Sequence, residues 1–193
     1  MSMTGSKWRA IGLVLALPLA ACGIGGESGR YLIDAPTSEA GVTRVSVATI
    51  ELRDVSLPSH ASGAEILVQM EDGALTPFGD AVWADDPERA VTGTLAQLLD
   101  DKSTATVAAE PWPLLDGPGA RLDVRIDKML ASVSGVFEIS GQAAVSAVDA
   151  SPRERVERFS VAAPITELSA AGIVDAQGRA LASLTDELIG LLR

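Results

Sequence analysis

Apolar and polar residues alternate through much of the second half of the chain. A two-residue period runs over residues 122–126, 137–147 and 159–165. This period is typical of β-strands with one buried side and one side that faces water. Only short polar segments, at 133–135 and 149–153, separate the three stretches. We therefore predict an antiparallel meander with one solvent-facing side.

The first half of the chain carries shorter apolar runs. Residues 31–33 predict an entry or edge strand, and residues 66–68 and 104–108 predict two further short strands. The longest run, Val42 to Leu52, is rich in β-branched residues and is apolar on both sides of the predicted strand. Such a strand is typical of the centre of a sheet, so we expect it to be covered on both faces.

Two segments have helical periodicity instead. Residues 85–88 (Asp-Asp-Pro-Glu) form a helix start, because a carboxylate can cap the first free amides and proline fits the first turn. This helix is predicted to end near Asp101, and its apolar stripe consists of Val91, Leu95, Leu98 and Leu99. A second helix is predicted near 174–192, with its stripe at Leu181, Leu184, Leu188 and Leu191. It would cover the side of the meander that does not face solvent.

Together these elements predict an α/β fold. We expect a single domain with a mixed β-sheet, whose antiparallel C-terminal meander is packed by at least two helices. The chain contains no internal repeat that would suggest several domains.

The N-terminus is typical of a bacterial lipoprotein precursor. Lys7 and Arg9 precede an apolar stretch, 11–19, that is too short to span a bilayer, and small residues then lead to Cys22. We predict a signal peptide over residues 1–21 that is cut before Cys22, whose thiol carries diacylglycerol. A single acyl chain binds a membrane only reversibly, so a lasting anchor needs two or three. The alternatives are an ordinary buried thiol and an uncleaved membrane helix.

A glycine-rich segment follows the cysteine. Residues 22–29 are predicted to be the acylated cysteine and a flexible tether, and residues 30–193 the periplasmic α/β domain. Gly23 occupies the position where enteric lipoproteins retained at the inner membrane tend to carry aspartate. We expect a lipid-anchored protein at the periplasmic face of a membrane, with the outer membrane favoured.

Charge and composition narrow the function classes. The whole chain has a net charge of −11, and loss of Lys7 and Arg9 with the leader makes the mature chain −13. An acidic surface argues against nucleic-acid binding and against a broad electrostatic grip on anionic lipid. His60 is the only histidine and Cys22 the only cysteine. We therefore expect no metal, no cofactor and no histidine-based catalytic dyad.

Charged groups that could suggest catalysis have simpler explanations. The acids at 85–88 already serve a helix start, and Asp123, Arg125 and Asp127 fit the solvated side of a strand. His60 lies in a predicted surface loop, and no Gly-x-Ser-x-Gly nucleophile elbow accompanies it. We expect that the protein is not an enzyme.

Three aromatic residues in or beside predicted loops are candidates for contact with a partner: Phe78, Trp83 and Trp112. A large aromatic side chain in such a place either fills the core or anchors a partner. Core packing is the favoured role for Trp83, because tryptophan is generally well buried. Trp112 lies between two prolines and fits both roles equally.

Several landmarks follow the predicted lipoprotein cleavage site in order: Tyr31-Leu32-Ile33-Asp34, a valine-rich strand that ends near Leu57-Pro58, Ile66-Leu67-Val68, Trp83-Ala84 before a capped helix, the meander and the leucine helix. In this series the mature chain resembles the ABC-type transport auxiliary lipoproteins, the PqiC-like family. It departs from the family pattern at Ser59-His60, where the family has an aromatic residue, and at Gln69, where a basic residue is common. The arginine before Trp83 is also missing.

This resemblance implies a role and partners. The family serves systems in which an ATP-binding subunit, a permease and an MCE-domain protein move lipids across the cell envelope. The lipoprotein would bind the MCE-domain protein and the permease–ATPase complex, and could self-associate, without chemistry of its own. Two alternatives share the anchor and the fold. One is an interaction lipoprotein that acts on a cell-wall synthase or an outer-membrane assembly machine, and the other is a carrier that binds lipid in an apolar cavity.

Overall fold

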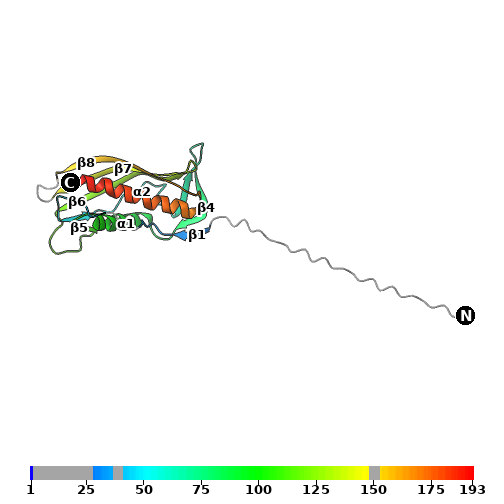
Figure 1. Ribbon diagram of the computed structural model, residues 1–193, viewed down its shortest axis with the longest axis horizontal. Helices are drawn as coiled ribbons and strands as arrows, with labels where there is room; N and C mark the ends of the chain where they lie inside the picture. The colour runs from blue at the N-terminus through cyan, green and yellow to red at the C-terminus, as the bar shows by residue number, and fades with distance from the viewer. Residues whose placement is uncertain (2–27, 37–40, 148–152) are drawn as a thin grey trace.

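The computed structural model describes Met1 and residues 28–36, 41–147 and 153–193. These residues form one sheet of eight strands and two helices (Figure 1). In chain order the elements are β1 (Ser28–Tyr31), β2 (Thr49–Leu52), β3 (Glu65–Gln69), β4 (Leu75–Trp83), α1 (Pro87–Lys102), β5 (Thr106–Ala109), β6 (Ala120–Ser132), β7 (Val136–Ala147), β8 (Arg155–Pro164) and α2 (Ala170–Leu191).

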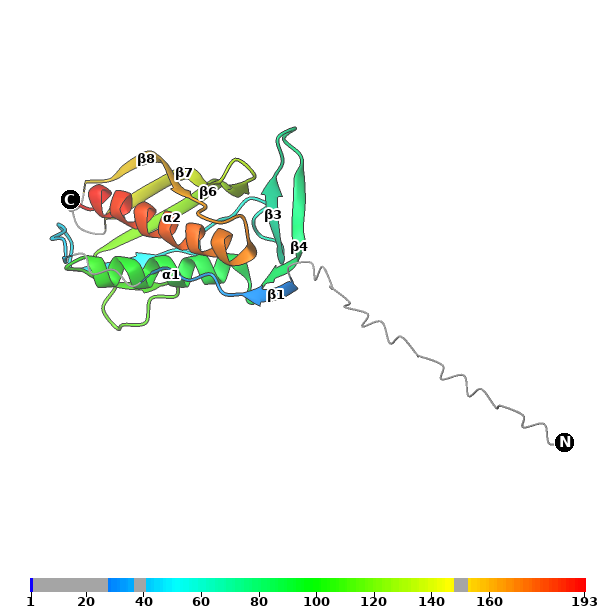
Figure 2. The ribbon, with the colours of Figure 1, turned by 45° about the vertical axis from the view of Figure 1, so that its right-hand side comes forward.

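The long strand β6 organises the sheet. One of its edges pairs antiparallel with β7, which pairs in turn with β8. Its other edge pairs in parallel with β2 near the start of β6 and with β3 near its end. Strand β5 extends the sheet beyond β2, while β4 and β1 extend it beyond β3. Both helices lie side by side on one face of the sheet (Figure 2), which confirms the predicted α/β architecture.

Strands β6, β7 and β8 form the predicted antiparallel meander. Val124 pairs with Ala143, and both side chains are buried beneath the helices. The next pair along, Arg125 and Gln142, lies on the opposite, open side of the sheet. The first turn falls at 133–135 as predicted, whereas most of the second turn lies outside the described residues.

Both predicted helices form, and their apolar stripes are buried. The carboxylate of Asp86 accepts a hydrogen bond from the amide of Arg89 at 3.0 Å and so caps α1. Helix α2 begins earlier than predicted, because Ser169 caps it by accepting a hydrogen bond from the amide of Gly172 at 3.1 Å. The described part of the chain contains no helix that is long and apolar enough to cross a membrane.

One core fills the space between the sheet and the helices. Its largest fully buried side chains come from both layers: Ile50, Leu52, Ile66, Leu95, Leu99, Leu122, Ile139, Ile173, Leu181, Leu184, Leu188 and Leu192. An ion pair also joins the two helices, because the Nζ of Lys102 lies 2.7 Å from Asp186. The lysine side chain is 6% exposed and the aspartate 67%. A buried charge that lost its partner would be costly, so Lys102 needs the carboxylate of α2 at this position.

The strand predicted over Val42 to Leu52 is wrong in its first part. Only residues 49–52 form β2, which does lie inside the sheet between β5 and β6. The preceding segment runs past the end of α1 instead, where the amide of Thr43 donates a hydrogen bond to the carbonyl of Lys102 at 2.7 Å. Thr43 forms only an isolated bridge with Ser103, and the amide of Ser46 donates to the carbonyl of Leu192 at 3.0 Å, so the segment does not continue the β2 ladder.

The first strand lies earlier in the chain than predicted. Because β1 begins at Ser28 and ends at Tyr31, Leu32 and Ile33 lie beyond it, and Leu32 is 65% exposed. The sheet therefore includes two residues of the segment that we expected to be tether. The predicted signal peptide and its cleavage site at Cys22 lie outside the described residues.

Strand β4 is absent from the sequence prediction, because Pro77 and Gly79 interrupt its apolar pattern. Proline is tolerated here because β1 pairs with β4 only from Asp80 onward, so the amide that Pro77 lacks is not needed. Gly79 has a φ of 58°, and Gly73, in the turn between β3 and β4, has a φ of 88°. Both values favour glycine. The β3–β4 hairpin projects from one end of the domain (Figure 2).

Candidate docking site

The three aromatic candidates for partner contact differ in exposure. Trp83 is the last residue of β4 and is only 7% exposed, so its side chain fills the core and does not face a partner. This burial agrees with the favoured role of Trp83 in core packing and removes it from the candidates for partner contact. Phe78 also lies in β4 rather than in a loop, and it is half-buried against the core. Trp112 is half-buried in the loop between β5 and β6.

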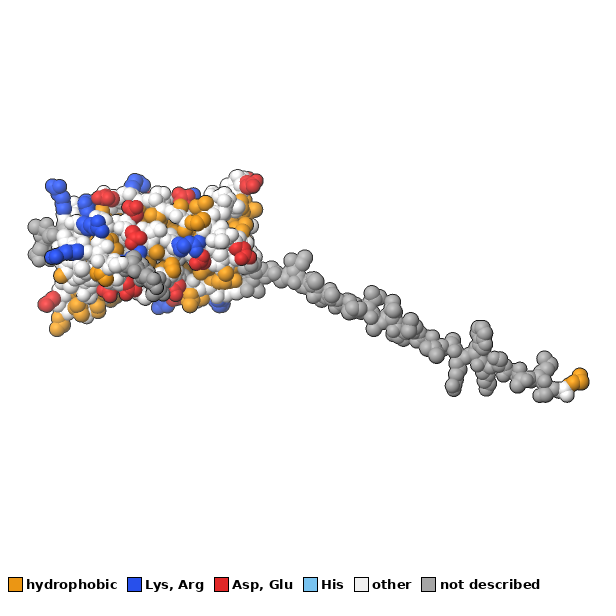
Figure 3. Space-filling view, in the orientation of Figure 1, with side chains coloured by type: hydrophobic (Ala, Val, Ile, Leu, Met, Phe, Trp, Pro, Cys, Tyr) orange, Lys and Arg blue, Asp and Glu red, His pale blue; other side chains and the backbone are white. Residues whose placement is uncertain are grey.

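The loop that contains Trp112 has an apolar tip. We call residues 110–119 the distal loop. Leu114 is 54% exposed and Leu115 is 106% exposed, so both leucines project into solvent. Figure 3 shows apolar side chains at the lower left of the molecule, where Figure 1 places the loop that follows β5. Adjacent exposed apolar side chains mark contact sites more often than isolated ones do.

The base of the distal loop is held by hydrogen bonds to β2. Glu51, which is 7% exposed, accepts a hydrogen bond from the amide of Trp112 at 3.0 Å. At the other end of the loop, the amide of Gly119 donates to the hydroxyl of Thr49 at 2.8 Å. The indole of Trp112 closes the loop by donating from Nε1 to the carbonyl of Asp116 at 2.7 Å. The two leucines are therefore presented by a loop that is fixed at both ends.

A fixed loop suits recognition for a physical reason. Ordering a flexible loop on binding costs conformational entropy, and a loop that is already held in place avoids most of that cost. The distal loop also lies at the end of the domain opposite β1, as the positions of β5 and β1 in Figure 1 show. An apolar tip in this position is available to a molecule that approaches from the side away from β1.

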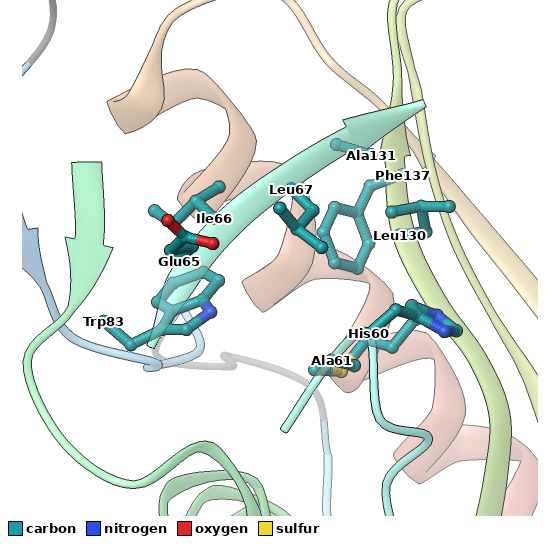
Figure 4. A pocket seen from close by; sticks show the side chains of 10 residues that line it. His60, Ala61, Glu65, Ile66, Leu67, Trp83, Leu130, Ala131 and Phe137 are labelled. Atoms are coloured by element: carbon teal, nitrogen blue, oxygen red, sulfur yellow. The ribbon is translucent and has the colours of Figure 1, made fainter. Parts of the chain in front are cut away.

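His60 is less accessible than predicted for a surface loop. Its Nε2 is buried and has no hydrogen-bond partner among the described residues. Burial lowers the pKa of His60 from its usual 6.5, and the positive charge of Lys128 lowers it further. The histidine borders a cavity of about 20 Å³ whose walls include Trp83 and Phe137 (Figure 4). A water molecule needs roughly 10–15 Å³, so this cavity has room for about one.

The acidic residues at the start of α1 have structural roles, and Asp86 is the helix cap. Asp85 accepts a hydrogen bond from the amide of Asp86 at 2.8 Å, and it pairs with Arg89 at 2.5 Å. The hydrogen bond from Arg89 lowers the pKa of Asp85, and the bond from the Asp86 amide adds to the effect. Glu88 accepts from the amide of Leu57 at 3.4 Å. Among the residues that the structure describes, no group of three or more His, Cys, Asp and Glu side chains is placed to hold a metal ion.

Sequence reasoning found Trp112 but missed the residues that complete the site, namely Glu51, Leu114 and Leu115. A signal for Glu51 was present, because it is the only charged residue between Val45 and Leu52. A charge inside such an apolar run requires a partner. The partner is the backbone of a loop 61 residues later in the chain, which a local pattern does not reveal.

The architecture and the exposed loop define an α/β domain with an apolar surface loop that is suited to contact with another molecule. The family model of the ABC-type transport auxiliary lipoprotein component matches residues 31–189, and the chain belongs to this family. The match runs from the end of β1 nearly to the end of α2. The family resemblance in the sequence is thus confirmed, and with it the assignment as a lipoprotein component auxiliary to ABC-type transport.

Solved structures share the fold. The crystal structure of an uncharacterized protein aligns with a TM-score of 0.66 at 13% identity, covering 80% of this chain and 100% of the other. Protein XCC0632 from Xanthomonas campestris aligns with a TM-score of 0.61 at 17% identity, covering 83% of this chain and 91% of the other. No curated protein matches the chain.

Proposed function

We propose that this protein is a lipid-anchored, non-enzymatic auxiliary subunit of an MCE-type ABC system that transports lipids across the cell envelope. Acylation of Cys22 holds the domain at the periplasmic face of a membrane, and the absence of aspartate after that cysteine favours the outer membrane. The distal loop docks on the MCE-domain protein of the conduit. The permease and ATPase belong to the same assembly.

The observation that carries this proposal is the distal loop. Leu114 and Leu115 are exposed, yet the loop behind them is held by Glu51 and Thr49. Burying both leucines in an apolar groove of a partner would contribute roughly 1.5–3 kcal/mol for each side chain. That energy is enough to make the tip a principal contact.

The alternative of a lipid carrier requires a cavity for an acyl chain. The cavity beside His60 measures about 20 Å³, which suits one water molecule rather than a lipid tail. Two hollows of about 360 and 420 Å³ are lined largely by charged side chains, which do not suit an acyl chain. The space between the helices and the sheet is filled by core side chains such as Leu99, Leu122 and Leu184, which are fully buried. These observations favour docking over lipid carriage.

The test is co-purification from native membranes. Tagged full-length protein is solubilised gently, captured, and its partners are identified by mass spectrometry. The wild-type chain should recover an MCE-domain protein and a permease. A double variant, Leu114→Ser with Leu115→Ser, should lose most of this recovery because the apolar tip is gone. Leu168→Ser is the matched control, since Leu168 is 46% exposed and lies outside the loop, before α2.

Two results would contradict the proposal. Recovery of a cell-wall synthase or an outer-membrane assembly factor would support the alternative interaction lipoprotein. Equal recovery by the double variant and the wild type would remove the loop from the interface. A Cys22→Ala variant tests the anchor separately, and it should leave the membrane fraction while its fold is retained.

A further inference from the structure

A hollow with a volume of about 360 Å³ lies on the open side of the sheet, opposite the helices. Small side chains form its floor, because Ala144 on β7 lies between longer residues of the neighbouring strands. Val156 of β8 borders the hollow on one side, and Arg121 and Arg125 of β6 border it on the other. Arg53, from the segment after β2, completes the arginine side. We call this place the arginine hollow.

Each arginine of the hollow forms an ion pair through its Nε atom. The Nε of Arg121 lies 2.7 Å from Glu51, and the Nε of Arg125 lies 3.1 Å from Asp123, which also lines the hollow. In a third, looser pair, the Nε of Arg53 lies 3.5 Å from Glu110.

The Nη groups of these arginines donate no hydrogen bond to any described residue. The carboxylates thus orient the guanidinium groups and leave their outer donors available to a ligand. Guanidinium donors of this kind match the oxygens of phosphate and carboxylate groups.

The charge of the hollow selects the kind of anion. Three arginines face three carboxylates, so the site is close to neutral, whereas the chain as a whole carries −11. A multiply charged anion would gain little Coulomb energy here, and it would be repelled by the rest of the surface. A singly charged group with several acceptor oxygens can still use the free Nη donors. A phosphodiester has these properties.

The apolar part of the hollow favours a ligand that carries an uncharged organic group beside its phosphate. Val156 is 65% exposed and pairs with Ala144, while Gln142 and Ser146, on either side of Ala144 along β7, pair with Arg125 and Arg121 and supply polar groups. An uncharged organic group attached to the phosphate could therefore pack on the valine while the phosphate faces the arginines.

We propose that the arginine hollow binds a phosphate group, with a phosphodiester such as a phospholipid headgroup preferred over free phosphate. The inference does not depend on the docking role of the distal loop. It assigns a ligand class to a part of the open sheet that the sequence pattern marks only as a solvated strand face.

The test measures dissociation constants on the full-length protein in a nonionic detergent. The probes are sn-glycero-3-phosphoglycerol, inorganic phosphate and glycerol. Arg125→Gln removes one guanidinium whose side chain is 63% exposed, so the fold should tolerate the change. Ala144→Leu fills the floor without altering charge. Arg89→Gln is the matched control, because Arg89 forms an exposed arginine–aspartate pair outside the hollow.

The wild type should bind the phosphodiester and not glycerol. Both hollow variants should weaken that binding by about tenfold, while the Arg89 control stays unchanged. Tighter binding of the phosphodiester than of inorganic phosphate identifies a headgroup as the ligand, and the reverse order identifies free phosphate. The proposal is overturned if neither phosphate probe binds, or if both hollow variants bind as the wild type does.

Discussion

Glu51 ties the distal loop to the sheet, and its removal should free the loop. One of its oxygens accepts from the amide of Trp112 at 3.0 Å, and the other accepts from Arg121 at 2.7 Å. A hydrogen bond to a charged group contributes about 1.5–3 kcal/mol. Glu51→Ala loses both bonds, but it also removes the cost of burying a carboxylate, and Arg121 is exposed enough to be hydrated. We therefore expect the free energy of unfolding to fall by about 2 kcal/mol.

Glu51→Gln separates the charge from the loop contact. The amide oxygen of glutamine can still accept from Trp112, but its NH₂ group would face the donors of Arg121. The expected loss is about 1 kcal/mol, with the loop still held. Urea unfolding measures the stability of both variants, and hydrogen exchange measures the protection of the loop amides.

The two variants should differ most in the loop. Amides of residues 110–119 should exchange much faster in Glu51→Ala than in the wild type, and Glu51→Gln should stay close to the wild type. Unchanged loop exchange in Glu51→Ala would refute the idea that Glu51 organises the docking site. If both variants freed the loop equally, the charge of Glu51 and its pair with Arg121, rather than a neutral acceptor for the Trp112 amide, would hold the loop.

Three further changes test other parts of the structure. Asp186→Ala should lower the free energy of unfolding by about 2 kcal/mol because it leaves the buried ammonium of Lys102 with only the carbonyl of Ala182 as an acceptor, whereas Lys102→Met should stay within about 1 kcal/mol of the wild type; urea unfolding compares them. The pKa of His60 is lowered by burial, so its contribution to stability is present above pH 6.5 and is lost as the pH falls through the folded-state pKa. Thermal unfolding at pH values on either side of 6.5 should show this loss, and His60→Gln should reduce it. Gly141→Ala would place a Cβ against a backbone carbonyl of β6 and should cost about 3 kcal/mol, while Ser140→Ala in the same assay should be nearly neutral.

The elements that the sequence predicted well are those whose pattern is repeated over many residues. The meander and both helices carry three or more turns or repeats of one period, so a single odd residue does not hide them. Strand β4 was not predicted, because Pro77 and Gly79 break its period. The pairing of β4 with β3 and β1 explains why these two residues are tolerated. The segment before β2 shows the opposite error, because a strand was predicted there and none forms. Its valines suit a strand, but its backbone bonds to the end of α1.

The candidate site could be predicted only in part, for a related reason. Trp112 was visible because a tryptophan between two prolines is conspicuous in any sequence. The contacts that place Trp112 in the site join residues far apart in the chain, because Glu51 accepts from both Trp112 and Arg121. The arginine hollow is of the same kind, because Arg53 and Arg125 meet only when β2 and β6 run side by side. A site whose residues come from different strands of a sheet cannot be predicted from the spacing of residues along the chain.

The short chain between the proposed anchor at Cys22 and β1 determines which end of the domain lies near the membrane. Six residue steps separate Cys22 from Ser28, and they can span at most about 20 Å. Helix α2, which runs along the length of the domain, has 22 residues and is about 33 Å long (Figure 1). The proposed anchor therefore keeps the β1 end of the domain near the lipid.

The distal loop and the arginine hollow both lie towards the other end, where β6 begins, and Glu51 contributes to each of them. An anion on the Nη donors of Arg121 would share this guanidinium with Glu51, and Glu51 also accepts the hydrogen bond that holds Trp112. The two contacts should therefore influence one another, so a ligand in the hollow would change how firmly the apolar tip is presented to a partner.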